Sequence, residues 1–256
     1  MTGSGQERSP ATVGRQLRRV AGGLRRRAKR VGQGRWAPAH RIPQLPGQRR
    51  GAPQDGFALT FDDGPDPEVT PAILDVLADE DATAAFFMCG LNAQRHPEIV
   101  RAVAGAGHLI GGHTWDHRPL REMTEDDWAL QIERTHSLLE ELSGQRISYV
   151  RPPRGLMDRR CHRRLRAAGL TPVNASAVGR DWKETDPAAI AGWVGARLDA
   201  GGIVLLHDAC GVLLPPGGRL SPGTHADRWP TVAATSRILA EARSAGLRPV
   251  PLPVPR

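Results

Sequence analysis

The sequence predicts an α/β fold in which helices cover a parallel β-sheet, preceded by a basic N-terminal tail. Two observations predict it: from Phe57 onward short β-type runs alternate with helix-like segments, and residues 1–50 differ in composition from the rest. At 256 residues, 39% of them hydrophobic, the chain is long enough for one large domain, which we place at residues 51–256. A barrel suits this length better than an open sheet, although the alternation fits both.

Strands are expected at short β-type runs, and helices at the helix-like segments between them. Thr124 followed by Asp127 is typical of a helix start. The predicted strands are Phe57–Phe61, Ala84–Met88, His108–Ile110, Ser148–Val150, Leu170–Val173, Ile203–Leu206 and Leu247–Val250. The predicted helices are Pro71–Asp79, Pro97–Ala106, Glu125–Leu142, Asp158–Ala168, Pro187–Leu198 and Thr231–Ala245.

The basic tail, residues 1–50, carries most of the chain's positive charge. It holds thirteen of the 35 basic residues and one of the 27 acidic ones, so its charge is +12 and the remainder carries −4 of the net +8. Its composition predicts disorder. The alternative is a short basic amphipathic helix over Val13–Val31, which could lie on an anionic membrane surface. Because the tail sets the positive net charge and the remainder is mildly acidic, we expect no nucleic-acid partner.

No apolar run suggests a membrane span or a conventional secretion signal, which leaves a cytoplasmic or membrane-peripheral location as the expectation from sequence. Cys89, Cys161 and Cys210 are widely spaced and form no CxxC pattern, so neither a zinc ribbon nor a disulfide framework is predicted. The sequence gives no indication of the oligomeric state. The segment Cys210–Trp229 is a long loop rich in Gly and Pro, for which a substrate-contacting role is plausible.

Two polar clusters follow predicted strands and together suggest a metal site. Asp62 and Asp63 end the first strand, where adjacent carboxylates repel each other unless a cation binds beside them. The alternative for that pair alone is a solvated Asp-Gly turn. His113 and His117 are four residues apart, a spacing that on a helical turn places both imidazoles on one face. Two histidines and one carboxylate are a three-ligand set that leaves positions for water and substrate.

Three further clusters complete the pattern: Arg151-Pro152-Pro153-Arg154-Gly155, Arg180-Asp181-Trp182 and Leu205-Leu206-His207-Asp208. Arg151 follows a strand and could orient a carboxylate, whereas Arg180-Asp181-Trp182 is weak alone. His207 ends an apolar strand. Four of the five clusters fall at predicted strand ends, where the catalytic groups of α/β barrels gather.

The five motifs, in this order, resemble the polysaccharide deacetylases, the NodB-homology or family-4 carbohydrate esterases. The resemblance extends from Thr60 to His207 and implies a distorted (β/α) barrel with seven strands. It also implies that Asp63, His113 and His117 bind one divalent ion, usually Zn²⁺, with Co²⁺, Ni²⁺ or Mn²⁺ as alternatives. Asp62 would be the general base, positioned by Arg151.

The same resemblance makes His207 the general acid, held and charged by Asp181. The backbone N–H of Arg154 would stabilise the oxyanion, and Trp182 and Leu205 would form walls of the pocket for the acetyl methyl group. The sequence departs from the family pattern at two positions. Arg154 stands where an aromatic residue is common, and Val178 stands where an Asp is usual.

The resemblance therefore predicts a metal-dependent hydrolase that removes N-acetyl groups from a GlcNAc-containing glycan, such as peptidoglycan or a chitin oligomer. One alternative keeps the metal site and changes the substrate to a formamide or another amide of a small molecule or lipid-linked sugar. A second is a protein that binds acidic polymers through its arginine-rich tail. A third is an inactive carbohydrate-binding relative, against which the complete set of site residues argues.

Overall fold

The computed structural model describes residues 55–211 and 225–253. The basic tail, and most of the long loop that we predict after Cys210, lie outside the described residues. In the part of the chain that is described, no helix is both long enough and apolar enough to cross a membrane.

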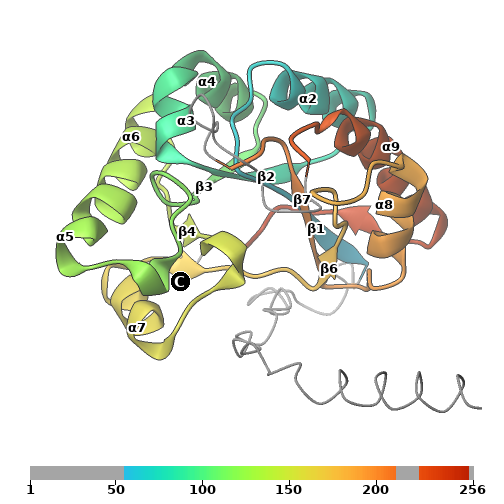
Figure 1. Cartoon of the computed structure of the whole chain (residues 1–256). Coiled ribbons are helices and arrows are strands. Elements are labelled where there is room, and N and C mark those ends of the chain that lie inside the picture. Colours follow the sequence, from blue (N-terminus) through green and yellow to red (C-terminus); the bar gives the residue numbers. More distant parts are fainter. Residues whose placement is uncertain (1–54, 212–224, 254–256) are drawn as a thin grey trace, which may run out of the picture. The chain divides into compact units, whose positions relative to one another are not determined.

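Within residues 55–211 and 225–253, eight short strands form one parallel sheet, in the order β5-β4-β3-β2-β1-β7-β6 with β8 paired to the start of β1. Side chains from β1, β2, β4 and β7 pack together on one face of the curved sheet, which forms a distorted half-barrel (Figure 1). The strands are β1 (Gly56–Asp62), β2 (Ala84–Met88), β3 (Leu109–Gly112), β4 (Tyr149–Val150), β5 (Thr171–Pro172), β6 (Ala177–Val178), β7 (Ile203–His207) and β8 (Arg248–Pro249).

Helices cover the outer face of the sheet (Figure 1). Local signals set several of their ends: Thr124 and Asp127 form a capping box, and Gly144 ends a helix in the left-handed conformation. The α-helices are α2 (Val69–Asp79), α3 (Gly90–Arg95), α4 (Pro97–Gly105), α5 (Glu125–Trp128), α6 (Arg134–Ser143), α7 (Arg159–Ala167), α8 (Pro187–Gly195) and α9 (Trp229–Ser244). Shorter turns are η1 (Leu120–Glu122), η2 (Ala129–Glu133) and η3 (Pro153–Gly155).

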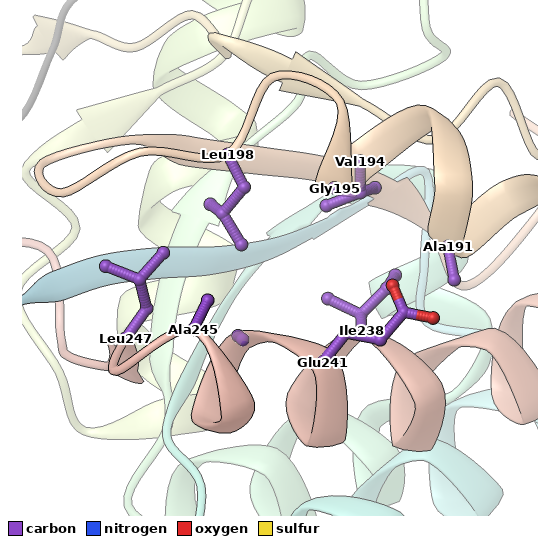
Figure 2. Close-up of a pocket in the computed structure, with 9 residues that line it drawn as sticks. Ala191, Val194, Gly195, Leu198, Ile238, Glu241, Ala245 and Leu247 are labelled. Carbon is purple, nitrogen blue, oxygen red and sulfur yellow. The ribbon is translucent and has the colours of Figure 1, made fainter.

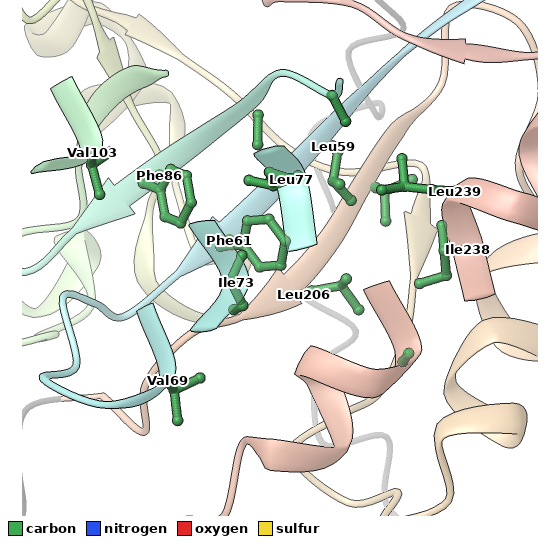
Figure 3. Packing of buried hydrophobic residues seen from close by; sticks show 14 of the residues in the cluster. Leu59, Phe61, Val69, Ile73, Leu77, Phe86, Val103, Leu206, Ile238 and Leu239 are labelled. Atoms are coloured by element: carbon green, nitrogen blue, oxygen red, sulfur yellow. The ribbon is translucent and has the colours of Figure 1, made fainter. Parts of the chain in front are cut away.

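The main core lies between the sheet and these helices. Figure 3 shows Phe61 beside Phe86, with ring centroids 5.1 Å apart, facing α2, α4 and α9. Because side chains alternate along a strand, Leu59 and Phe61 point into this core, whereas Thr60 and Asp62 point to the opposite face. The same alternation on β7 buries Leu206 in the core and turns Leu205 and His207 toward the inside of the half-barrel. The alternation of side chains along each strand thus determines which residues face the site.

The predicted α/β fold is confirmed, and each of the seven predicted strands is present. The two-residue strand β6 and the six-residue helix α3 were not predicted. The predicted helix Glu125–Leu142 is present as α5, a π-helical turn and α6 in direct succession.

Candidate metal centre and active site

All five polar clusters follow strands of the parallel sheet, so their side chains gather at one edge. Asp62 is the last residue of β1 and pairs with His207, the last residue of β7. Gly112 of β3 pairs with Val150 of β4, which brings His113 and Arg151 to neighbouring strand ends. The cluster around Asp181 follows β6, the strand that the sequence did not predict.

Asp63, His113 and His117 converge on one point. Asp63 Oδ1 lies 3.2 Å from His113 Nε2 and 3.3 Å from His117 Nε2. His113 Nδ1 lies 2.8 Å from the backbone oxygen of Arg151, so Nδ1 is the donor there and Nε2 is the ring nitrogen that faces Asp63. In the described parts of the chain this is the one group of three or more His, Cys, Asp or Glu whose ligand atoms lie within 4.8 Å of one another.

The two histidines are not on a helical turn, and that prediction was wrong. They lie in a loop after β3 that uses left-handed backbone at Thr114 (φ 65°) and His117 (φ 63°). Gln131 Oε1 accepts hydrogen bonds from the backbone N–H groups of Trp115 and Asp116, at 3.0 and 3.3 Å, and fixes this loop. The loop, rather than helical periodicity, brings the imidazoles together, with ring centroids 5.1 Å apart.

Asp63 is held by contacts that the sequence did not reveal. Its backbone is left-handed (φ 80°), its backbone oxygen accepts a 2.8 Å hydrogen bond from Asn92 Nδ2, and its Oδ2 accepts one of 2.8 Å from Gly211 N. Burial alone would raise the pKa of Asp63, but the neighbouring His117, His113 and His207 hold it well below its usual range. For His117 the effect of burial is the opposite: it lowers the pKa of the imidazole, although the negative charge of Asp63 acts to raise it. The centre therefore combines the carboxylate of Asp63 with the imidazole of His117, and burial favours the neutral form of that imidazole.

Asp62 lies beside this centre and forms a buried ion pair with Arg151. Arg151 Nη1 donates to Asp62 Oδ1 at 2.6 Å and to Thr60 Oγ1 at 2.7 Å. The guanidinium lies over the ring of Phe87, 4.1 Å from its centroid. The second oxygen of Asp62 lies 3.9 Å from His113 Nε2. One oxygen of Asp62 is thus paired and the other faces the three-ligand centre.

His207 is paired with the fully buried Asp181. Asp181 Oδ1 lies 2.8 Å from His207 Nδ1, and Asp181 Oδ2 accepts from His207 N at 2.7 Å and from Thr231 Oγ1 at 2.9 Å. Burial lowers the pKa of His207, but Asp181 outweighs it and raises the pKa to about 9. The pKa of Asp181 is lowered despite burial, by His207 and by Arg228. This pair keeps a proton on His207 at neutral pH.

The three predicted substrate-binding residues border this region. Trp182 packs edge-on against His207, with ring centroids 5.3 Å apart, and Leu205 precedes His207 on the same face of β7. Arg154 has left-handed backbone (φ 59°), and its side chain is exposed. Val178, which replaces the usual Asp, pairs with Leu205 in the sheet.

Two further residues, Asp208 and Arg228, support the site, and the sequence did not lead us to predict a role for either. Asp208 is buried, and its carboxylate accepts from Gly64 N at 3.1 Å and from Thr70 Oγ1 at 2.7 Å. Arg228 donates to the backbone oxygens of Ala209 and Asp181, at 2.9 and 3.3 Å. The position of Asp208 directly after His207 was a usable signal for the first, whereas nothing in the sequence pattern indicates Arg228.

Residues 49–173 match the family model described as polysaccharide deacetylase. A peptidoglycan-N-acetylglucosamine deacetylase of Bacillus cereus is 35% identical over 196 residues, which cover 77% of this chain and 66% of that protein. A chitooligosaccharide deacetylase of Azorhizobium caulinodans is 32% identical over 201 residues, covering 78% of this chain and 94% of the relative. This chain belongs to the polysaccharide deacetylase family.

The structural comparison agrees with this membership. The crystal structure of a peptidoglycan N-acetylglucosamine deacetylase, in complex with 4-naphthalen-1-yl-N-oxidanyl-benzamide, matches with a TM-score of 0.68 at 33% identity, covering 77% of this chain and 86% of that one. The predicted family is therefore confirmed, and the protein is a hydrolase of the deacetylase type that acts on carbon–nitrogen bonds.

A hollow of about 180 Å³ between α8 and α9 contains none of the predicted site residues (Figure 2). Its lining is apolar apart from Glu241, as the labelled side chains Val194, Leu198, Ile238 and Leu247 show. Apart from Glu241, this lining offers no acid, base or metal ligand.

Proposed function

We propose that the protein is a metal-dependent N-deacetylase acting on a glycan that contains N-acetylglucosamine. The observation that carries the proposal is the state of Asp63 Oδ1. This oxygen is buried and accepts no hydrogen bond within the described residues, although two imidazole nitrogens lie within 3.3 Å. An unpartnered buried carboxylate oxygen is costly, and a divalent cation between it and the two imidazoles would remove that cost.

The donor set fits such an ion. Asp63, His113 and His117 supply one oxygen and two nitrogens, which suits zinc and also cobalt, nickel or manganese. The hydrogen bond from His113 to the Arg151 backbone oxygen directs the Nε2 lone pair of His113 toward the ion's position. A bound ion would polarise the substrate carbonyl and lower the pKa of a water molecule.

Asp62 is suited to take the proton from the attacking water. Its free oxygen faces the three-ligand centre, and its other oxygen is held by Arg151, which fixes the direction of the carboxylate. The pairing with Arg151 holds the carboxylate in place for this role as general base.

His207 is suited to give the proton that the leaving nitrogen requires. The water oxygen bonds to the acetyl carbon, Asp62 takes one water proton, and the C–N bond breaks as His207 protonates the departing amine. Acetate and a free amino sugar result. The pKa of about 9 keeps His207 protonated before this step, and Asp181 stabilises the imidazolium.

The remaining residues would shape the acyl pocket. The left-handed backbone of Arg154 presents its N–H group as a donor for the oxyanion, and Trp182 and Leu205 flank the histidine where the small methyl group would lie. The two relatives described above are named for N-acetylglucosamine glycans, which supports the same substrate class here.

The test is acetate release from N-acetylglucosamine oligomers by protein stripped of metal and reloaded with Zn²⁺ or Co²⁺. We expect metal-dependent acetate release that is lost in His113→Ala and Asp62→Asn. The matched controls are His162→Ala and Asp126→Asn, which change exposed residues of the same types outside the site. Loss of one acid–base group should lower the rate by about 10²–10⁴-fold.

Tight binding of one metal ion without acetate from any sugar would contradict the glycan substrate and leave the centre intact. Small formamides and amides are then the substrates to assay. Equal activity of His113→Ala and His162→Ala would contradict the metal centre itself.

A further inference from the structure

A strongly basic surface follows the site along the chain. Residues 151–170 hold seven arginines and one acid, Asp158, a local charge of +6. Since residues 51–256 carry −4 in all, the rest of the domain carries −10. We call the exposed part of this segment the α7 surface; its residues are Arg154, Arg159, Arg160, Arg163 and Arg166. Such a separation of charge focuses an electrostatic field over one region of an otherwise acidic domain.

At the N-terminal end of helix α7, the positive charge opposes the electrostatics of the helix, whereas Arg164 and Arg166 lie in the last turn, where positive charge is favourable. Cys161 and Leu165 bury its apolar side, so the arginines are confined to the outer side. Arg159 and Arg163 are like charges four residues apart, and Arg159 lies at the helix N-terminus, where positive charge is unfavourable. Two unfavourable placements of positive charge on one helix surface are characteristic of a functional site, where a bound ligand supplies the compensating negative charge.

The α7 surface is continuous with the active site. Arg154 lies three residues after Arg151, whose guanidinium holds the proposed base Asp62. Because α7 follows the strand β4, its N-terminus lies at the sheet edge where the site residues gather. A small recess at the start of α7 is lined by Arg121, Arg160 and Arg164, among others.

We propose that the α7 surface binds anionic groups of the glycan substrate, carboxylates or phosphates on the sugars next to the N-acetylated one. Guanidinium groups pair with planar carboxylates and with phosphates through two parallel hydrogen bonds. The proposal rests on the proposed function, because it takes the reacting sugar to lie at the metal centre. A polymer in that position extends over the neighbouring βα loops, and the loop that carries Arg154 is one of them.

The test compares two N-acetylated oligosaccharides of equal length, one uncharged N-acetylglucosamine oligomer and one in which alternate sugars carry a carboxylate. The variant is the double substitution Arg159→Gln and Arg163→Gln. The matched control is Arg101→Gln with Arg237→Gln, which removes the same charge from exposed positions on α4 and α9. We expect kcat/KM for the anionic oligomer to fall about 2- to 30-fold in the α7 variant alone, with the neutral oligomer unchanged.

High salt provides a second readout, since the Debye length shrinks from about 10 Å at 0.1 M to about 3 Å at 1 M. The preference of the wild-type protein for the anionic oligomer should disappear at 1 M salt. Equal effects of the α7 and control variants, or equal effects on both oligomers, would overturn the proposal. So would unaltered glycan kinetics combined with selective loss of binding to phosphatidylglycerol vesicles, which would identify the surface as a membrane contact.

Binding measured by calorimetry separates this proposal from the proposed function. If neither oligomer releases acetate, the deacetylase substrate is wrong. Tighter binding of the anionic oligomer to Asp62→Asn protein, reduced by the α7 substitutions, would still support an anionic carbohydrate ligand at this surface. Equal binding of the two oligomers would refute the α7 surface independently of turnover.

Discussion

Replacement of Asp181 by Asn removes the carboxylate that keeps His207 protonated. Asp181 contacts both Nδ1 and the backbone N–H of His207, and the folded-state pKa of His207 is about 9, against an ordinary value of 6.5. The difference corresponds to about 3 kcal/mol of preference for the imidazolium. Without Asp181, the burial that lowers the pKa of His207 is opposed only by the more distant Asp63 and Asp62.

We therefore expect the pKa of His207 in Asp181→Asn to fall to about 6.5 or below. At pH 8 the protonated fraction would drop from about nine tenths to about 3%, so kcat/KM should fall roughly 30-fold and the alkaline limb of the pH profile should move down by about 2.5 units. At pH 5.5 the loss should be much smaller. The assay is acetate release across this pH range, with Asp126→Asn as the control for an exposed carboxylate.

An alkaline limb at the same pH in Asp181→Asn and wild type would refute the assignment of His207 as the acid charged by Asp181. The ion pair should also affect stability in a defined direction. Because the folded-state pKa is raised, its stabilisation is present below about pH 6.5 and is lost as the pH rises through about 9. Urea unfolding of wild type and Asp181→Asn should therefore converge in stability at high pH.

Three other predictions concern the support of the centre. A Cβ at Gly64 would lie 2.1 Å from Asp208 Oδ2, so Gly64→Ala should destabilise the fold by about 1–3 kcal/mol in urea unfolding, and adding Asp208→Ala should recover part of that loss. Arg151→Gln leaves Asp62 buried without its cation, so it should lower the free energy of unfolding by about 3–5 kcal/mol and also lower activity. An unchanged free energy of unfolding would contradict a stabilising role for this ion pair. Removal of metal with a chelator should lower the melting temperature reversibly, and an identical Tm with and without Zn²⁺ would argue against the three-ligand centre.

The sequence predicted the sheet well because strand signals are local. Apolar runs such as Ala84–Met88 are fully buried strands, and their alternation with helical patterns determined the parallel arrangement. The two-residue strand β6 has no such signal, since its pairing with β7 depends on a distant partner. Because β6 was not predicted, no strand was expected before Asp181, although this residue lies at the same sheet edge as the other site residues.

The error at His113 and His117 has a related cause. A spacing of four residues indicates a shared helical face only where the backbone is helical, and here left-handed residues at Thr114 and His117 turn the chain instead. Gln131 holds that turn from the π-helical segment between α5 and α6, far along the sequence. The residue types were informative about metal binding, whereas the backbone that positions them depends on tertiary contacts.

The contact between Gly64 and Asp208 shows that residues of the first and last motifs depend on each other for their positions. The glycine in the first motif reads as part of a turn, yet its lack of a side chain makes room for a carboxylate from the last motif. That carboxylate accepts the Gly64 N–H and the Thr70 hydroxyl, which ties the loop after the Asp63 ligand to α2 and β7. Burial and the nearby Asp63 raise the pKa of Asp208 to about 7, so the loop carries an acid that is partly protonated near neutral pH. The fully formed hydrogen bonds of this buried acid therefore support the loop that carries the Asp63 ligand.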